Sequence, residues 1–203
     1  MGPLLISGVL IEEKDLGKLE EIGVDDSKKL KPEERENLFD RIKKIAKDFE
    51  IIKIEPGEVD RAVFGEKGLN LNWLEAEKTI KIINKLKPDK TIIDCPSVNI
   101  EAYRNYILED LKDKSIELVV MHKADAENVV VGAASILAKV TRDREIEKLK
   151  KKYGDFGSGY PSQEKTQKYL KDNWNKHPEI FRKSWSSWKN VQKKEEQKNL
   201  DNF

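Results

Sequence analysis

The chain has 203 residues, of which 37% are hydrophobic and 38% charged, and its formal net charge is +1. This length allows one sizeable core, and the runs of Ile, Leu and Val exclude a wholly disordered protein. The single cysteine, Cys95, excludes a disulfide framework and a cysteine-based zinc site, and with no apolar run of membrane-spanning length it favours a reducing, cytoplasmic location.

Apolar runs and apolar residues at helical spacing predict alternating strands and helices over most of the chain. In chain order we expect a strand over Leu4–Ile11, a polar loop over Val24–Leu30, a helix from Pro32 carrying Leu38, Ile42 and Ile45, a strand over Phe49–Ile54, a helix over Asn72–Leu86, a strand over Thr91–Asp94, a helix over Ile100–Leu111, a strand over Ile116–Met121 and a long helix over Glu127–Tyr153 that allows one break. This alternation predicts an α/β fold with a mixed sheet.

The chain changes character after the long helix. A glycine-rich loop spans Gly154–Pro161, and short helices follow, in which Trp174, Trp185 and Trp188 are expected to pack. The charged tail is expected to be flexible. We therefore predict an α/β domain over residues 1–153, a helical C-terminal subdomain over 154–191 and a flexible tail over 192–203.

Two carboxylates stand where predicted strands end. Asp94 closes one apolar run, and Asp125 follows the next run after a short polar link. Catalytic residues of α/β sheets gather at the carboxyl ends of strands, and carboxylate oxygens are the ligands that Mg²⁺ and Mn²⁺ prefer. Both residues therefore qualify as metal ligands. The alternative is that they are turn or helix N-cap residues.

The loop Gly157-Ser158-Gly159-Tyr160 is a second candidate site. Glycines let backbone N–H groups approach phosphate, and a tyrosine offers a ring for stacking and a hydroxyl for a ribose 2′-OH. A helix C-cap followed by a turn is the structural alternative. Lys and Arg concentrate in the C-terminal half, which suits a phosphate backbone or simply a solvated surface.

Several motifs occur in an order and at a spacing that resemble the ribonuclease HII family across nearly the whole chain. The matching segments are Asp26-Ser27-Lys28-Lys29-Leu30, His122-Lys123-Ala124-Asp125, the run from Ala133 to Asp143, and Gly157-Ser158-Gly159-Tyr160-Pro161-Ser162.

The resemblance implies a ribonuclease-H-like sheet flanked by helices, with a helical C-terminal subdomain. It implies hydrolysis of the RNA strand of RNA–DNA hybrids on the 5′ side of a ribonucleotide, with Mn²⁺ or Mg²⁺ as cofactor. A monomer is the default expectation for the working form, because the sequence leaves the oligomeric state open. Asp94 and Asp125 match two of the family's acidic metal ligands, and Tyr160 matches its ribose-sensing tyrosine. The residues that would contact the nucleic acid are Ser27, Lys28, Lys29, Lys123, Gly157, Gly159 and Tyr160.

The sequence departs from the family pattern at its start. The family opens with a strand and Asp-Glu-Ala-Gly-Arg-Gly, followed by Gly-Pro, and here Met1-Gly2-Pro3 matches that later Gly-Pro. A central strand and two acidic ligands are therefore expected to be missing, which would leave open edges on two neighbouring strands. With two carboxylates, a pair of divalent ions would be poorly neutralised, and we expect cleavage to be weakened by orders of magnitude.

Three explanations stay open at this point. One is an enzyme whose true start lies upstream of Met1. The second is a non-catalytic protein that binds RNA–DNA hybrids or a sliding clamp. The third is a nonfunctional remnant that does not fold alone.

The C-terminal tail carries a possible partner motif. Gln197, Leu200 and Phe203 stand at positions i, i+3 and i+6, so one helical turn would bring their side chains together for a hydrophobic pocket. The pattern resembles the sliding-clamp (PCNA) interaction motif, although Phe203 lacks the usual second aromatic. The alternative is an unstructured charged tail.

Overall fold

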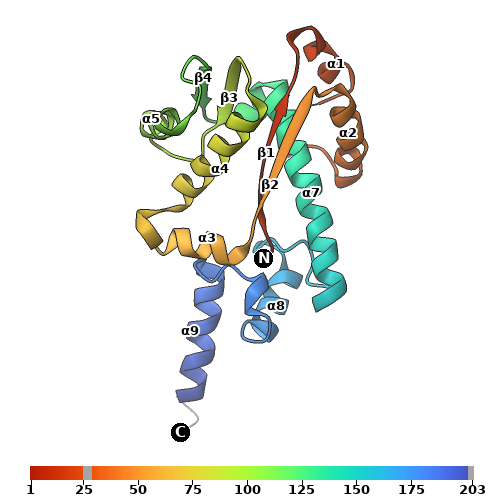
Figure 1. The fold of residues 1–203 in the computed structure, drawn as a ribbon. Coiled ribbons are helices and arrows are strands. Elements are labelled where there is room, and N and C mark those ends of the chain that lie inside the picture. The colour runs from red at the N-terminus through yellow and green to blue at the C-terminus, as the bar shows by residue number, and fades with distance from the viewer. Residues whose placement is uncertain (25–28, 201–203) are drawn as a thin grey trace. The chain divides into compact units, whose positions relative to one another are not determined.

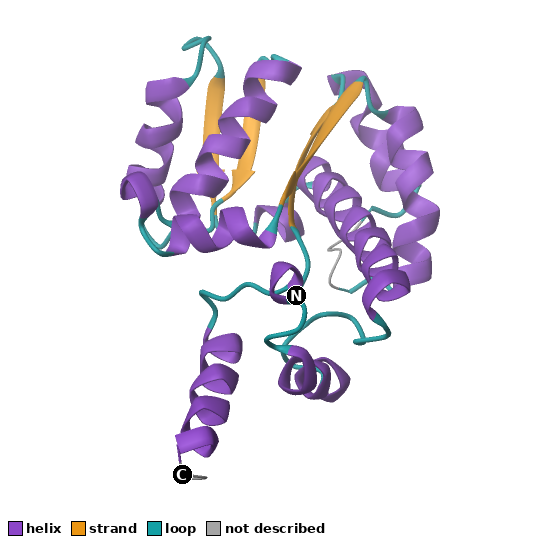
Figure 2. Ribbon diagram, turned by 60° about the horizontal axis from the view of Figure 1, so that its bottom comes forward, coloured by secondary structure: helices purple, strands orange, loops and turns teal. Residues whose placement is uncertain are grey.

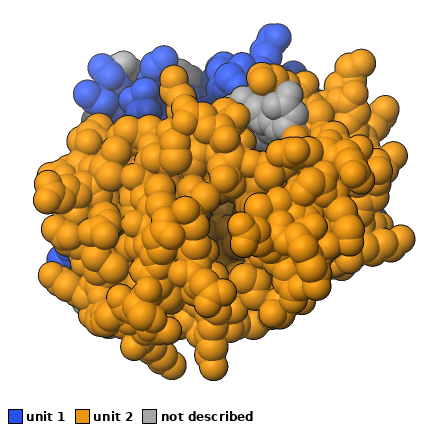
Figure 3. Space-filling model, turned by 90° about the horizontal axis from the view of Figure 1, so that it is seen from above, with its two compact units in different colours: residues 1–4, 53–71, 142–203 blue, residues 5–52, 72–141 orange. Residues whose placement is uncertain are grey.

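The computed structural model describes residues 1–24 and 29–200 (Figure 1). The chain forms two compact units (Figure 3). Unit 1 comprises residues 1–4, 53–71 and 142–203, and unit 2 comprises residues 5–52 and 72–141. These units do not follow the expected boundary at residue 153, because residues 1–4 and 53–71 group with the C-terminal part, and the domain division stays a prediction. No helix in the described ranges is long and apolar enough to cross a membrane.

The strands and helices follow the predicted order. The strands are β1 (Leu4–Leu10), β2 (Asp48–Ile54), β3 (Lys90–Asp94) and β4 (Glu117–Met121), and the α-helices are α1 (Leu16–Glu21), α2 (Pro32–Ile45), α3 (Pro56–Val63), α4 (Leu71–Leu86), α5 (Ile100–Asp110), α6 (Ala124–Glu127), α7 (Val129–Tyr153), α8 (Glu164–Asn173) and α9 (Ser186–Leu200). Sequence analysis misses α1 and α3, because such short helices show little apolar periodicity.

In the described ranges the strands form two two-stranded sheets (Figure 2), and the expected α/β class with flanking helices is confirmed. β1 pairs with β2, and β3 pairs with β4. The second pair is parallel, with Lys90 opposite Glu117 and Asp94 opposite Met121. Among the described residues no strand bridges the two pairs, so they do not join into one sheet.

Helices pack closely on β1 within unit 2. A side chain at Gly8 would collide with Ile82 of α4, and the Ser7 hydroxyl donates to the Ala134 carbonyl of α7. Ala133, beside Ala134, is fully buried, so small residues bring this part of α7 close to the strand. These contacts place α4 and α7 against β1, whose residues are all partly buried rather than fully buried as the sequence predicts.

The long C-terminal helix of the prediction is broken once, as expected. Asn128 separates α6 from α7. Its side-chain Oδ1 accepts hydrogen bonds from the backbone N–H groups of Val130 and Val131 over 3.0 and 3.3 Å. This N-cap satisfies donors at the first turn of α7, so the break carries little cost in unpaired backbone groups.

Unit 1 has its own core, formed by α8, α9 and the end of α7. The buried residues are Ile146, Phe156, Leu170, Ile180 and Phe181. Trp174 and Trp188 pack against them with their rings edge to face, 5.8 Å between centroids. The indole N–H of Trp188 donates to the Trp174 carbonyl over 3.3 Å, which confirms a packing role for both residues.

The expected flexible tail from Gln192 is wrong as far as Leu200, because α9 continues through that residue. Lys, Glu and Gln are good helix formers. The Gln192 amide also donates to Glu196 Oε1 over 2.9 Å, a pairing of side chains one turn apart that supports the helix.

A buried carboxylate joins α3 to the segment before α9 in unit 1. Asp60 is 7% exposed, and its Oδ2 accepts the Lys183 N–H over 2.8 Å. Its Oδ1 accepts the Ser184 N–H over 2.8 Å and the Ser184 hydroxyl over 2.7 Å. Removing this acceptor would leave two backbone N–H groups unsatisfied in the interior.

We therefore expect Asp60→Ala to lower the free energy of unfolding by about 2–4 kcal/mol, because buried donors would lose a charged acceptor. Urea denaturation followed by circular dichroism measures this change. Asp172→Ala, at an exposed position of α8, is the matched control and should shift stability by about 0.5 kcal/mol or less. Equal effects of the two substitutions would show that the Asp60 contacts do not stabilise unit 1.

Candidate active site

The first carboxylate of the candidate site stands at the end of β3. Asp94 lies opposite Met121, the last residue of β4, and the ladder continues as the Cys95 N–H donates to the Met121 carbonyl over 2.8 Å. Asp94 Oδ1 accepts the backbone N–H of Ala124 over 3.1 Å. Asp94 is exposed, so its carboxylate is accessible while this bond holds its position.

The second carboxylate follows directly after Ala124. Asp125 lies inside α6 and is 7% exposed, so its predicted place ahead of a helix beginning near Glu127 is wrong. The N-cap of α6 is Lys123, whose φ of 58° is in the left-handed region. This conformation turns the chain sharply out of β4. Asp125 therefore stands at the same sheet edge as Asp94, as expected for the carboxyl ends of parallel strands.

A histidine ties the segments after the two strands together. The Nδ1–H of His122 donates to the Cys95 carbonyl, with 3.1 Å between the atoms. Burial raises the pKa of the Cys95 thiol above its ordinary value, and its Sγ lies 3.3 Å from the Ser97 carbonyl oxygen. The thiol therefore faces a backbone carbonyl of the segment after β3.

The donor set at this edge suits one hard divalent cation. Asp94 and Asp125 offer carboxylate oxygens, and Mg²⁺ commonly takes one or two carboxylates while keeping several waters. Among the residues that the structure describes, no group of three or more His, Cys, Asp and Glu side chains could hold a metal ion. These residues therefore fit a single ion completed by water or phosphate oxygens, and they are too few for a closely spaced pair.

The glycine-rich loop belongs to unit 1 and is shaped by its own contacts. Gly157 and Gly159 have φ values of 76° and 75°, which side chains other than glycine rarely adopt. The Gly157 N–H donates to Asp155 Oδ1 over 2.9 Å, and the Ser158 N–H donates to Gln163 Oε1 over 2.8 Å. Gly154, with a φ of 87°, caps the end of α7 by donating to the Lys150 carbonyl, so the backbone here is a helix C-cap followed by a turn that these side chains hold.

Tyr160 closes this loop against an arginine. It is 46% exposed, and the guanidinium carbon of Arg142 lies 3.9 Å from its ring centroid. The Arg142 side chain is 12% exposed and donates from Nη2 to the Ser158 carbonyl over 2.9 Å. Sequence analysis does not single out Arg142, whose only signal is its place in the segment from Ala133 to Asp143 that resembles the family signature.

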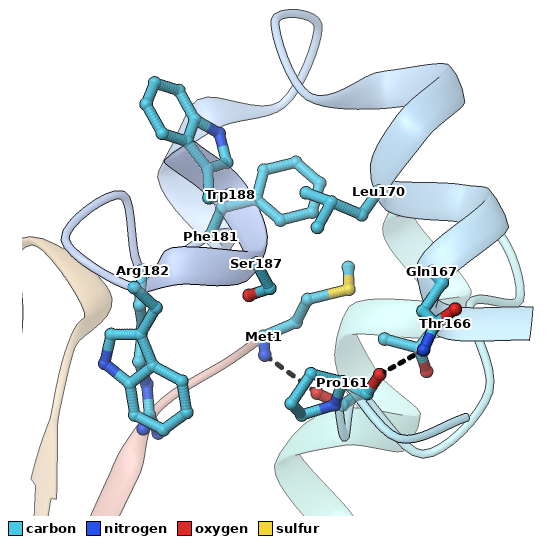
Figure 4. Close-up of a pocket in the computed structure, with 11 residues that line it drawn as sticks. Met1, Pro161, Thr166, Gln167, Leu170, Phe181, Arg182, Ser187 and Trp188 are labelled. Carbon is cyan, nitrogen blue, oxygen red and sulfur yellow. Dashed lines mark hydrogen bonds between the residues drawn. The ribbon is translucent and has the colours of Figure 1, made fainter. Parts of the chain in front are cut away.

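A small pocket of unit 1 lies against the same loop (Figure 4). Met1 lies in it, and its backbone nitrogen donates to the Gly159 carbonyl over 2.8 Å. The Gln167 amide donates to the Pro161 carbonyl over 2.7 Å. These two hydrogen bonds hold the loop against the residues that line the pocket. Its lining residues are Met1, Gly159, Pro161, Thr166, Gln167, Leu170, Phe181, Arg182, Trp185, Ser187 and Trp188.

The remaining predicted contact residues are placed unevenly. Lys123 is exposed beside the carboxylates in unit 2, and Lys29 is exposed in a turn of the same unit. Ser27 and Lys28 lie outside the described residues.

The predicted clamp motif is described only in part. Gln197 is exposed on α9, and Leu200 ends the same helix. Phe203 lies outside the described residues. The helix thus includes the backbone of the first two motif positions.

Comparison with known proteins identifies the family. A model of the family described as ribonuclease HII matches residues 1–190. Ribonuclease HII of Pyrococcus furiosus is 42% identical over an alignment that covers all of this chain and 92% of that protein. The ribonuclease HII of Pyrococcus abyssi is 44% identical, with 100% and 91% of the two chains covered.

Solved structures agree with this assignment. The crystal structure of ribonuclease H2 from Pyrococcus horikoshii matches with a TM-score of 0.84 and 40% identity, over 96% of this chain and 92% of that one. The structure of the PCNA:RNase HII complex from Archaeoglobus fulgidus matches with a TM-score of 0.80 and 38% identity, over 94% and 88% of the chains. The chain therefore belongs to the ribonuclease HII family of divalent-metal-dependent endonucleases, which hydrolyse the RNA strand of RNA–DNA hybrids.

Proposed function

We propose that Asp94 and Asp125 hold the catalytic Mn²⁺ or Mg²⁺ and that the loop of Gly157, Gly159 and Tyr160 reads the ribose at an RNA–DNA junction. The observation that carries this proposal is the hydrogen bond from the Ala124 N–H to Asp94 Oδ1, which fixes one carboxylate next to the segment that bears the other. The expected product of cleavage 5′ to a ribonucleotide has a 3′-OH and a 5′-phosphate.

At the carboxyl end of β3 and β4, the protein's own residues position charged side chains. Asp94 is exposed and can meet an incoming phosphate, whereas the buried Asp125 is held by the turn at Lys123. When bound, a divalent ion neutralises the phosphate charge and activates a water for hydrolysis. The exposed Lys123 ammonium adds positive charge for the nucleic-acid backbone.

The loop in unit 1 supplies recognition. Tyr160 offers an exposed hydroxyl-bearing ring, which suits contact with a ribose and its 2′-OH. Lys29, with Ser27 and Lys28 of the same motif, is proposed to follow the phosphate backbone. Such contacts position the duplex without reading its sequence.

The C-terminal motif is proposed to bind a sliding clamp. Gln197 and Leu200 both belong to α9, and the solved complex from Archaeoglobus fulgidus shows a similar protein together with PCNA. Phe203 would complete the motif in a hydrophobic pocket of the clamp. A cytoplasmic monomer is the proposed working form.

Asp94→Asn should lower cleavage of a duplex that contains one ribonucleotide by roughly a hundredfold or more, because the ion loses a charged ligand. The amide oxygen can still accept the Ala124 N–H, so hybrid affinity should change by less than about threefold. End-labelled substrate with Mn²⁺ or Mg²⁺ measures cleavage, and fluorescence anisotropy measures binding.

Asp89→Asn is the matched control for Asp94→Asn, because Asp89 is exposed at the opposite end of β3. Cleavage by this control should equal that of the unsubstituted chain. Equal cleavage by the Asp94 variant would remove Asp94 from the metal site. Hybrid binding with no cleavage by the unsubstituted chain in Mn²⁺ would instead support a non-catalytic binding protein.

Tyr160→Ala should reduce the preference for a ribonucleotide junction over an all-DNA duplex by about tenfold, because stacking and the hydroxyl contact are lost together. Tyr160→Phe keeps the ring and separates the two contributions. The ratio of the two dissociation constants is the measurement. An unchanged ratio for Tyr160→Ala would assign the loop a purely structural role.

Leu200→Ala combined with Phe203→Ala should weaken binding to an archaeal sliding clamp by about tenfold or more, since two anchors of the motif are removed. Surface plasmon resonance with immobilised clamp measures the affinity. Lys194→Ala, at an exposed position of α9 outside the motif, is the control and should bind normally. Clamp binding that survives the double substitution would place the interaction elsewhere.

A further inference from the structure

We propose that Arg142 is a positioning residue for junction recognition: it holds Tyr160 and its loop in the orientation that reads the ribose. This inference rests on the recognition role proposed for Tyr160 and assigns the residue on which that role depends. Arg142 comes from α7, so a helix, rather than the loop itself, would set the direction of the ring.

Two contacts from one guanidinium support this assignment. Its carbon lies 3.9 Å from the Tyr160 ring centroid, within the range of a cation–π stack. Its Nη2 donates to the Ser158 carbonyl over 2.9 Å. One guanidinium thus contacts both the tyrosine ring and the loop backbone, a combination for which arginine is suited and lysine is not.

Arg142 is more buried than Tyr160, as expected if the arginine holds the ring in place. The Arg142 side chain is 12% exposed, whereas Tyr160 is 46% exposed. The guanidinium therefore supports the ring from the protein side while much of the tyrosine stays open to a ligand. A residue that bound phosphate directly would be expected to present its guanidinium to solvent.

The backbone of the loop is built around this arginine. The backbone of Gly159 has a φ of 75°, a conformation that favours glycine. A Cβ atom added there would lie 3.4 Å from Arg142 Nη2 and 3.2 Å from Ile146. Arg142 also contacts Asp143 Oδ1 at 3.4 Å, but this carboxylate is 41% exposed and binds it weakly. The loop contacts therefore dominate the position of the guanidinium.

The first test is a double-mutant cycle on discrimination, measured as the ratio of dissociation constants for an all-DNA duplex and a duplex with one ribonucleotide, in Ca²⁺. Arg142→Ala should lower this ratio by about tenfold, and in a Tyr160→Ala background the same change should alter it by less than about twofold. Arg142→Lys should behave like Arg142→Ala, because it keeps the charge and loses the planar stack. The salt dependence of duplex binding should be the same for Arg142→Ala as for the unsubstituted chain.

A direct phosphate contact predicts the opposite pattern and would overturn the proposal. Arg142→Ala would then weaken binding to both duplexes equally, act additively with Tyr160→Ala and reduce the salt slope by about one. Arg142→Lys would restore most of the affinity. Arg144→Ala, which removes a charge from an exposed position two residues along α7, controls for loss of charge alone.

A second measurement needs no nucleic acid and keeps the proposal testable if the role of Tyr160 itself fails. Hydrogen exchange followed by mass spectrometry should show faster exchange of residues 155–163 in Arg142→Ala than in Arg144→Ala, because the Ser158 and ring contacts are lost. Equal exchange in the two variants would show that Arg142 does not hold the loop. A failure of discrimination in the unsubstituted chain would count against the proposed function of Tyr160 and leave this measurement decisive for Arg142.

Discussion

The candidate site depends on the hydrogen bond between the Ala124 N–H and Asp94 Oδ1 at the end of the parallel pair β3–β4. The parallel register brings the two strand ends level, and the bond then links one carboxylate to the residue that precedes the other. Lys123 makes this possible by adopting a left-handed conformation. The proposed metal-binding edge thus arises from backbone geometry, with side chains added at fixed points.

The loop proposed for recognition, in unit 1, is held in place in a different way. There the glycine loop is held by side chains that reach it from separate helices, with Arg142 from α7 and Gln167 from α8 bonded to loop carbonyls. Loops carry binding residues well when a rigid scaffold supports them. The residues proposed for chemistry and those proposed for recognition therefore belong to different units.

Sequence reasoning located the strand ends well, since short apolar runs that stop at a carboxylate have a clear pattern, and Asp94 stands where expected. It misplaced Asp125 relative to its helix, because a four-residue helix started by a left-handed lysine has no periodic signal. It missed Arg142, whose role depends on contact with a loop that follows its helix. It also stopped the last helix early, because charged residues suit both a helix and a tail.

Titration calorimetry with Mn²⁺ in the absence of nucleic acid tests the central claim most directly. The chain should bind Mn²⁺, and the double variant Asp94→Asn with Asp125→Asn should bind it at least about tenfold more weakly while keeping its circular dichroism spectrum. An unchanged affinity in the folded double variant would contradict the account, because the metal would then be held away from the β3–β4 edge.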